Sequence, residues 1–290
     1  MSFSLWIDPS FGASGDMLLG AFAEMVSDPE QALFPLHDLG LGDWKIDFEK
    51  TLRNGLNATK AEVTYGETST GRKWSEIDAL IKDSSLPLQV IEGSQRTFLL
   101  LAQVEAEQHG VALDDVHFHE VGAVDAILDV VGTWLLRFAL EDEVGVIDGI
   151  AVGPVGLGSG SVKASHGTLP LPAPATIGIL KDCPITNVNT KSETCTPTGA
   201  ALLVSLANRW GNISTGYIRR SSRGAGTRNP DDYPNIVSMV LTENPETDEA
   251  TTSKYLIETN VDDVTPEILA TTIEKLLEEG AEDAWITPII

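Results

Sequence analysis

The stretch that decides the fold is FSLWIDPSFGASGD, residues 3–16. Phe3 to Asp8 is a short apolar run, which predicts a β-strand, and the glycine-containing turn Pro9 to Ala13 separates it from a helix that begins at Ser14. Ser14 suits the N-cap of that helix and Asp16 suits its positive end. The stretch therefore predicts an α/β fold that begins with a strand, a tight turn and a helix.

Two carboxylates flank this turn, Asp8 at the end of the strand and Asp16 at the start of the helix. Open α/β sheets bind ligands at this kind of position, so we predict both residues as metal ligands. The alternative is structural: the turn needs glycine for its backbone, and Asp16 only offsets the helix dipole.

The composition narrows the function. The chain has 290 residues, with 19 Lys and Arg against 43 Asp and Glu, a formal charge of −24, and a hydrophobic fraction of 42%. These values exclude a disordered, collagenous or coiled-coil chain. So acidic a surface repels phosphate backbones and anionic lipid, which argues against nucleic-acid and membrane partners and favours cations.

Targeting and redox signals are sparse. The N-terminus lacks the basic and apolar regions of a signal peptide, and no apolar run approaches 18 residues, so we expect a cytoplasmic protein. Cys183 and Cys195 form no CxxC motif, which argues against a disulfide scaffold and a thiolate zinc site.

Hydrophobic periods place the remaining elements. Alternation predicts a hairpin over 44–65, with Asn54-Gly55 in a loop longer than the tightest type. The other predicted elements are helices over 74–82 and 88–108, a buried strand over 144–152, and helices that begin near Glu120 and at Thr196-Pro197.

A polar stretch, Asn244 to Ser253, has no apolar period and reads as a linker. Beyond it we predict a strand over 255–259, a helix from Thr265-Pro266, and a last strand over 285–290. We therefore expect a mixed α/β (α+β) domain over 1–245 and a second unit over 253–290. So small a unit rarely buries its own apolar face, so we expect it to be incomplete or completed by another chain.

The densest cluster of chemistry-bearing residues follows the strand-like segment at 117. His117 and His119 point to one side of an extended segment, and Asp125 and Asp129 lie one turn apart on one face of the next helix. Two imidazoles with carboxylates suit a borderline divalent ion such as nickel, zinc, iron or manganese. The alternative is that one His packs or caps and the acids are solvated.

Three further clusters are candidates for phosphate or metal. Four arginines lie within ten residues beside two glycines and suit a phosphate or carboxylate, or they neutralise the protein's own acids: Arg219, Arg220, Arg223, Gly224, Gly226 and Arg228. Oxygen ligands before the last helix suit Mg²⁺ or Mn²⁺ beside a nucleotide, or form a solvated acidic turn: Glu258, Asn260, Asp262 and Asp263. The glycine-rich stretch 153–160 could offer N–H groups to phosphate, but it lacks P-loop spacing.

Taken in order, these motifs resemble the signatures of the LarC family, the nickel insertion proteins of the nickel-pincer nucleotide cofactor pathway. The residues that carry the resemblance are Asp8–Met17, His117–Asp125, His166–Ala175, Thr196–Ala201, Gly224–Gly226 with Pro234–Asn235, and Glu258–Asp263. The match runs from residue 3 to the last residue.

The resemblance implies a CTP-dependent cyclometallase, a lyase. Such an enzyme inserts Ni²⁺ into pyridinium-3,5-bisthiocarboxylic acid mononucleotide, forms sulfur–nickel and carbon–nickel bonds, and cleaves CTP to CMP and pyrophosphate. The product serves lactate racemase and related enzymes. The resemblance also implies a nickel-handling N-terminal part, and a ferredoxin-like C-terminal domain that binds CTP with Mn²⁺ or Mg²⁺ and forms oligomers.

On this resemblance we assign His117 and His119 as nickel ligands or base, Glu120 as a supporting catalytic carboxylate and Asp125 as a supporting metal-site carboxylate. Asp262 and Asp263 are assigned to the ion of CTP. The remaining cofactor-binding candidates are Arg219, Arg223, Gly224, Gly226, Arg228, Glu258 and Asn260.

Two departures from the family pattern stand out. The family's C-terminal domain continues past the point that matches Ile290, and the polar stretch 244–253 has no His. We therefore expect a homo-oligomer or a second chain that completes the C-terminal domain. A non-catalytic nickel carrier is the alternative function, and a generic metal-dependent phosphohydrolase explains the carboxylates but not the ordered motifs.

Overall fold

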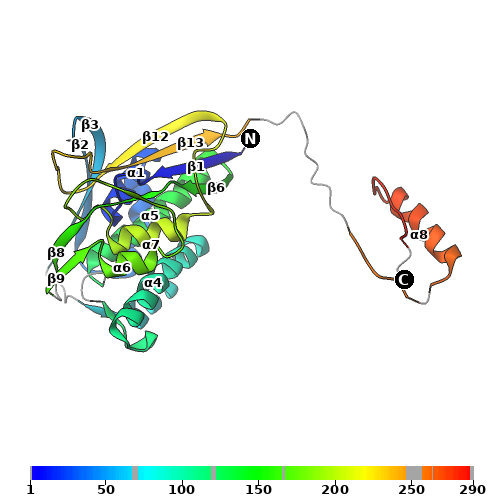
Figure 1. Cartoon of the computed structure of the whole chain (residues 1–290), viewed down its shortest axis with the longest axis horizontal. Coiled ribbons are helices and arrows are strands. Elements are labelled where there is room, and N and C mark those ends of the chain that lie inside the picture. The colour runs from blue at the N-terminus through cyan, green and yellow to red at the C-terminus, as the bar shows by residue number, and fades with distance from the viewer. Residues whose placement is uncertain are drawn as a thin grey trace. The chain divides into compact units, whose positions relative to one another are not determined.

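The computed structural model describes residues 2–66, 71–118, 122–164, 167–245, 257–262 and 264–287. The chain divides into two compact units, Met1–Glu246 and Thr247–Ile290. The mixed α/β class predicted for the first unit is confirmed by a seven-stranded sheet with helices packed on it (Figure 1).

The central sheet of the first unit has the strand order β11-β6-β1-β13-β12-β3-β2. Strand β1 pairs in parallel with β6, β6 with β11, and β12 with β3, whereas β13 and β2 run antiparallel to their neighbours. The strands are β1 (Phe3–Asp8), β2 (Trp44–Arg53), β3 (Leu56–Tyr65), β6 (Ile147–Val152), β11 (Arg209–Trp210), β12 (Tyr217–Ala225) and β13 (Ile236–Glu243). Strands β1, β3, β6, β11 and β12 therefore end at one common edge.

Helices cover the sheet in successive layers. Helix α1 lies against β12, β3 and β13, α5 packs on α1, and α4 packs on α5 and α7 (Figure 1). The helices of this unit are α1 (Gly15–Met25), α2 (Pro29–Leu33), α3 (Trp74–Lys82), α4 (Leu88–His109), α5 (Val124–Val144), α6 (Pro174–Ile179) and α7 (Pro197–Leu206), with 3₁₀ turns η1 (Phe34–Leu39) and η2 (Leu113–Asp115).

Three small two-stranded sheets complete the unit: β4 (Arg72–Lys73) with β5 (His117–Phe118), β7 (Val155–Leu157) with β10 (Ile185–Asn187), and β8 (Gly160–Ala164) with β9 (Gly167–Leu171). The glycine-rich stretch and the proline-rich segment after it therefore lie in these peripheral ribbons, outside the central sheet.

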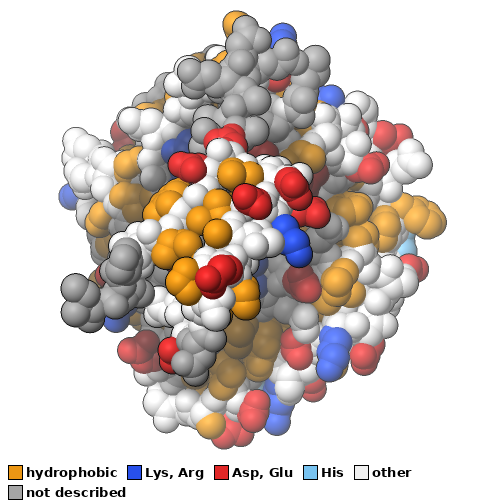
Figure 2. Space-filling model, turned by 90° about the vertical axis from the view of Figure 1, so that its right-hand side faces the viewer, with side chains coloured by type: hydrophobic (Ala, Val, Ile, Leu, Met, Phe, Trp, Pro, Cys, Tyr) orange, Lys and Arg blue, Asp and Glu red, His pale blue; other side chains and the backbone are white. Residues whose placement is uncertain are grey.

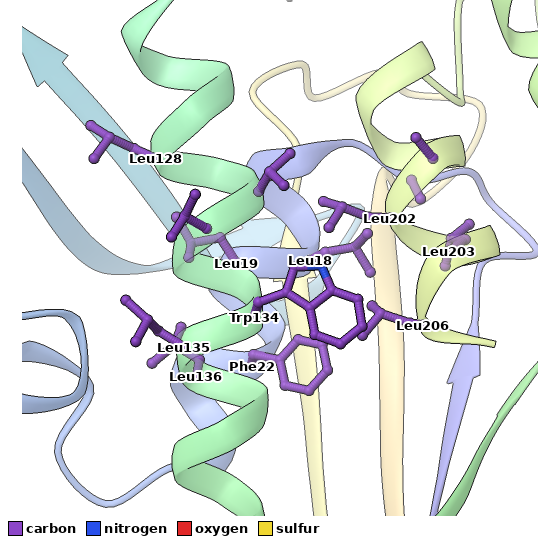
Figure 3. Packing of buried hydrophobic residues seen from close by; sticks show 14 of the residues in the cluster. Leu18, Leu19, Phe22, Leu128, Trp134, Leu135, Leu136, Leu202, Leu203 and Leu206 are labelled. Carbon is purple, nitrogen blue, oxygen red and sulfur yellow. The ribbon is translucent and has the colours of Figure 1, made fainter. Parts of the chain in front are cut away.

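The core lies where α1, α5 and α7 meet. Figure 3 shows Leu18 and Phe22 of α1 facing Trp134 of α5 and the leucines of α7. Trp134 also sits against α4, because a Cβ added at Gly93 would lie 2.4 Å from its ring. Its indole N–H donates to Thr97 Oγ1 at 3.1 Å, so the buried ring leaves no donor unpaired.

Several predicted boundaries are confirmed and two details are wrong. Strand β1, helix α3 and the start of α7 match the prediction, and the Thr196 hydroxyl accepts the Gly199 N–H as an N-cap should. The hairpin loop is the two-residue type after all, since Arg53 pairs with Leu56. Ser14 occupies the N-cap position of α1, but its hydroxyl bonds to Asp16 and does not cap the backbone.

The second unit contains α8 (Pro266–Glu278), which begins after Thr265 as predicted. The strands predicted over 255–259 and 285–290 are wrong for the described residues 257–259 and 285–287, which are not in strands. A strand needs a hydrogen-bonded neighbour, and the described part of this unit offers none. The start of a ferredoxin-like domain stays a prediction.

The surface agrees with the composition. Figure 2 shows acidic side chains spread over the face that it draws, among apolar ones. In the part of the chain that the structure describes, no helix has the length and apolarity needed to cross a membrane.

Candidate functional site at the carboxyl ends of the strands

Three loops pack backbone against backbone around the turn that follows β1. A Cβ added at Gly12 would lie 1.9 Å from the Thr194 carbonyl oxygen, and one at Gly156 would lie 2.0 Å from that of Ser10. The Gly156 N–H donates to the Pro9 carbonyl at 2.8 Å. Glycine is required at these positions because no side chain fits between the loops.

The first turns of three helices converge on the same loop. A Cβ added at Gly15, the first residue of α1, would lie 2.4 Å from Asp129 Oδ2 of α5, and one at Gly199 of α7 would lie 2.3 Å from the Ala13 carbonyl oxygen. Helix N-termini carry partial positive charge. The sequence therefore places acidic residues where the helix dipoles favour negative charge.

Asp16 is held by three donors. Its Oδ1 accepts the Ser14 hydroxyl and the Met17 N–H at 2.9 Å, and its Oδ2 accepts Thr227 Oγ1 at 3.3 Å. Burial raises the pKa of the Asp16 carboxyl above its ordinary value, while these donors and the nearby Lys60 ammonium oppose the rise. Asp16 is therefore a positioned carboxylate in a poorly solvated place.

Asp129 is the unusual member of the cluster. Its Oδ1 is buried and has no hydrogen-bond partner among the described residues. Burial raises the pKa of the Asp129 carboxyl well above its ordinary value, and the negative charges of Asp16 and Asp125 raise it further. An orphaned buried oxygen beside two other carboxylates is costly for the fold, which points to a functional reason for keeping it.

Asp125 and Asp8 complete the acidic edge. Asp125 Oδ1 accepts the Ala126 N–H at 2.9 Å, and its charge adds to burial in raising the pKa of Tyr65 at the end of β3. Asp8 Oδ1 accepts the Ser10 N–H at 3.0 Å, which shapes the turn. The predicted metal role of Asp8, Asp16 and Asp125 stays a prediction.

Of the histidine cluster the structure describes one member. His117 is exposed on β5, opposite Lys73 of β4, while its neighbour Phe118 is buried against Phe98 with ring centroids 6.4 Å apart. His119 and Glu120 lie outside the described residues. Among the residues that are described, no three His, Cys, Asp or Glu side chains are grouped so as to hold a metal ion.

The predicted arginine cluster does not converge. Arg219 pairs with Glu243, Arg220 with Glu143 at 2.8 Å, and Arg228 with Glu193 at 3.6 Å. Arg219 lies near the start of β12, and Arg228 follows the end of β12 at Ala225, which is about 20 Å from Arg219 along an extended strand. This arrangement favours the alternative that these arginines neutralise the protein's own acids.

The structure itself requires glycine at positions 224 and 226, without any bound ligand. A Cβ at Gly224 would lie 1.7 Å from the Met17 carbonyl oxygen, and one at Gly226 would lie 2.4 Å from Asn235 Nδ2. In the second unit Glu258, Asn260 and Asp262 are exposed, and Asp263 lies outside the described residues. The cofactor-binding roles of these residues and of exposed Arg223 stay predictions.

Sequence reasoning did not single out Lys60, Tyr65 and Thr227. Tyr65 ends β3 and Thr227 follows β12, and both strands are parallel to β1, so these two residues come to the same edge, whereas Lys60 lies in the middle of β3. Asp129 was seen to share a face with Asp125, but its contact with the start of α1 depends on helix packing. Thr227 follows the Gly224–Gly226 motif, which is the one local signal available.

Fold and site together define an α/β protein with a carboxylate cluster at the carboxyl ends of its parallel strands. The chain belongs to the nickel insertion protein family, whose model matches residues 5–290, and the predicted LarC-family identity is thereby confirmed. No solved structure matches it.

Curated relatives agree. A "Pyridinium-3,5-bisthiocarboxylic acid mononucleotide nickel insertion protein" of Staphylococcus saprophyticus is 39% identical over 289 residues, covering 100% of this chain and 72% of the relative. A protein with the same name from a Nocardioides species is 39% identical over 98% of this chain and 70% of its own length. A "Putative nickel insertion protein" of Geobacter metallireducens is 39% identical over 98% and 72%.

Proposed function

We propose that this protein inserts nickel into pyridinium-3,5-bisthiocarboxylic acid mononucleotide in a CTP-dependent cyclometallation. The observation that carries the proposal is family membership over nearly the whole chain, together with relatives named for this substrate. The negative charges of Asp16 and Asp125 act on buried Asp129, and this local excess of negative charge supports the proposal because it attracts cations, although the three side chains do not form a ligand set by themselves.

The chemistry explains why few protein ligands suffice. In the product, nickel is held by two thiocarboxylate sulfurs and one ring carbon of the substrate, so the protein must deliver the ion and need not enclose it. Imidazole and carboxylate are suitable donors for transient binding of Ni²⁺. We assign this delivery to His117, His119, Asp8, Asp16 and Asp125.

Forming the carbon–nickel bond requires loss of the ring proton. A neutral imidazole at His117 or His119 could accept it, with Glu120 orienting the ring. His117 lies on the surface of the first unit, in β5.

The second unit carries the proposed CTP role. Glu258, Asn260 and Asp262 offer oxygen atoms suited to Mg²⁺ or Mn²⁺, with Asp263 beside them. The described residues of this segment do not gather three such ligands, so we derive no step through CTP or its ion.

The test is an incubation of the purified protein with Ni²⁺, CTP, Mn²⁺ and the thiocarboxylated precursor, followed by detection of the nickel product. We expect product only when both CTP and precursor are present. Nickel binding without product would instead favour a non-catalytic carrier that needs a separate chain, and phosphate release without precursor would favour a phosphohydrolase.

Residue roles need a separate measurement. Replacing His117 and His119 together by Ala should abolish stoichiometric nickel binding in calorimetry, whereas His109→Ala, an exposed histidine at the end of α4, should not. Undiminished binding in the double variant would remove the assignment.

A further inference from the structure

The first unit has a polar cavity for which no role has been assigned so far. It has a volume of about 430 Å³ and is lined by Ser159, Asn189, Thr190, Lys191, Ser192 and Asp232. It lies between the glycine-rich stretch, the segment 189–192 and the loop before β13. The sequence had offered the glycine-rich stretch only as a weak phosphate signal.

The walls of this cavity are fixed by backbone contacts. The Ser159 N–H and hydroxyl both donate to the Thr190 carbonyl, at 3.0 and 3.1 Å. A Cβ added at Gly158 would lie 2.2 Å from the Ser192 carbonyl oxygen. The glycine-rich stretch therefore serves to bring the two walls together, and the cavity is a built feature of the fold.

The lining suits a phosphate monoester. Asn189, Thr190 and Ser192 bring amide and hydroxyl groups, and Lys191 brings an ammonium group. Lys191 makes no hydrogen bond or ion pair with another described residue, unlike Lys50 and Lys60, which pair with glutamates. In a chain of net charge −24, an ammonium left for a ligand is what an anionic substrate requires.

The cavity and the carboxylate cluster are joined by two consecutive residues. Thr227 donates to Asp16, whereas Arg228 pairs with Glu193, next to the cavity residue Ser192. The Arg228 carbonyl accepts Asn235 Nδ2 at 2.9 Å, which holds this loop in place. A ligand with a phosphate at one end and a metal-binding ring at the other could therefore reach both places.

We infer that this cavity binds the 5′-phosphate of the pyridinium mononucleotide, with Lys191 as the charged contact, so that the ring points toward the carboxylate cluster. The inference rests on the proposed function for the identity of the substrate. Asp232 is the one acid in the lining, and its charge opposes the bound phosphate.

The test is direct binding by calorimetry, without nickel or CTP, using nicotinic acid mononucleotide as a pyridinium mononucleotide and nicotinic acid riboside as its analogue without phosphate. We expect Lys191→Gln to weaken mononucleotide binding about tenfold, as for loss of one charged hydrogen bond. Riboside binding should not change. Lys181→Gln is the matched control, since Lys181 is likewise exposed but lies outside the cavity lining.

A second variant tests whether removing negative charge from the cavity strengthens mononucleotide binding. Asp232→Asn should tighten mononucleotide binding about two- to fivefold, because it removes a like charge, and Asp231→Asn, an exposed neighbour outside the lining, should have less effect. Damage to the fold would weaken binding, so a gain cannot arise that way.

Three outcomes would overturn the inference: no mononucleotide binding by the unaltered protein at millimolar concentration, equal loss in the Lys191 and Lys181 variants, or, in a separate titration with CTP, loss of CTP binding by Lys191→Gln while its mononucleotide binding is unchanged. The last would move the cavity to CTP. None of them touches the nickel-insertion assay, so failure of this inference and failure of the proposed function are distinguishable.

Discussion

Helices α1 and α8 have similar lengths but differ in how far their residues are buried. Nine of the 11 residues of α1 are buried, whereas none of the 13 residues of α8 is. Ile268, Leu276 and Leu277 of α8 are between 46% and 57% exposed. The sequence pattern predicts both helices equally well, but α1 packs on a sheet and two helices of its own unit, whereas the described residues of the second unit contain no other helix or strand. Helix formation is local, whereas most of the stability of a helix comes from its tertiary partners.

The largest expected effect is in the α1 core. Phe22 is fully buried and faces Trp134 (Figure 3). Phe22→Ala should lower the free energy of unfolding by about 3–5 kcal/mol, because it removes a buried ring and leaves a cavity. Urea unfolding followed by tryptophan fluorescence measures this loss. A loss below about 1 kcal/mol would contradict the close packing of α1.

A slightly smaller effect is expected where α1 meets the sheet. Gly224→Ala would place a Cβ 1.7 Å from the Met17 carbonyl oxygen, so α1 or β12 must move. We expect a loss of about 2–3 kcal/mol from overpacking, in the same urea experiment. Gly66→Ala is the control, because a Cβ at Gly66 has no neighbour within 4 Å, and it should lower the free energy of unfolding far less. Gly55→Ala would not serve, because Gly55 has a φ of +79°, which strains any other residue.

Elements with a local sequence signal could be predicted, whereas features that depend on pairing between strands could not. The apolar run of β1 and the Thr196-Pro197 signal of α7 are local, and both predictions are confirmed. The hairpin loop was predicted too long because its register is fixed by cross-strand pairing of Arg53 with Leu56.

The site follows the same division. Asp16 and Asp125 could be chosen as candidates because local motifs contain them. The neighbours Lys60, Tyr65 and Thr227 require knowledge of the strand order, which no local window contains. The contact of Asp129 with Gly15 requires the packing of α5 on α1.

Burial does not stabilise every group in the first unit, and the buried carboxyl of Asp129 is the exception that can be tested. Burial and the negative charges of Asp16 and Asp125 disfavour the charged form of Asp129, so Asp129→Asn, which cannot ionise, should raise the free energy of unfolding at neutral pH by on the order of 1 kcal/mol. The same variant should impair nickel insertion, since function and stability conflict at such sites.

The raised pKa of Asp129 also predicts the direction in which stability changes with pH. Because the pKa of Asp129 is raised in the folded protein, the folded state keeps a proton that the unfolded chain releases above the ordinary value of 3.8. The folded state therefore binds more protons, and stability falls as the pH rises from the ordinary pKa through the raised one. Unfolding measured from pH 4 upward should show this fall in the unaltered protein and less of it in Asp129→Asn. Equal pH profiles would contradict the burial of a titrating carboxyl.

The smallest expected effect is in α8. Leu276 is 49% exposed and α8 has no buried residue, so Leu276→Ala removes far less buried area than Phe22→Ala and replaces leucine with a residue of equal or better helix propensity. The melting temperature of the first unit should stay unchanged and the helix content by circular dichroism should not fall, with a stability change within about 0.5 kcal/mol. Phe22→Ala provides the contrast within the same chain. A loss of several kcal/mol at Leu276 would mean that the apolar side of α8 is buried in solution. The two helices would then differ in what they pack against and not in whether they are buried.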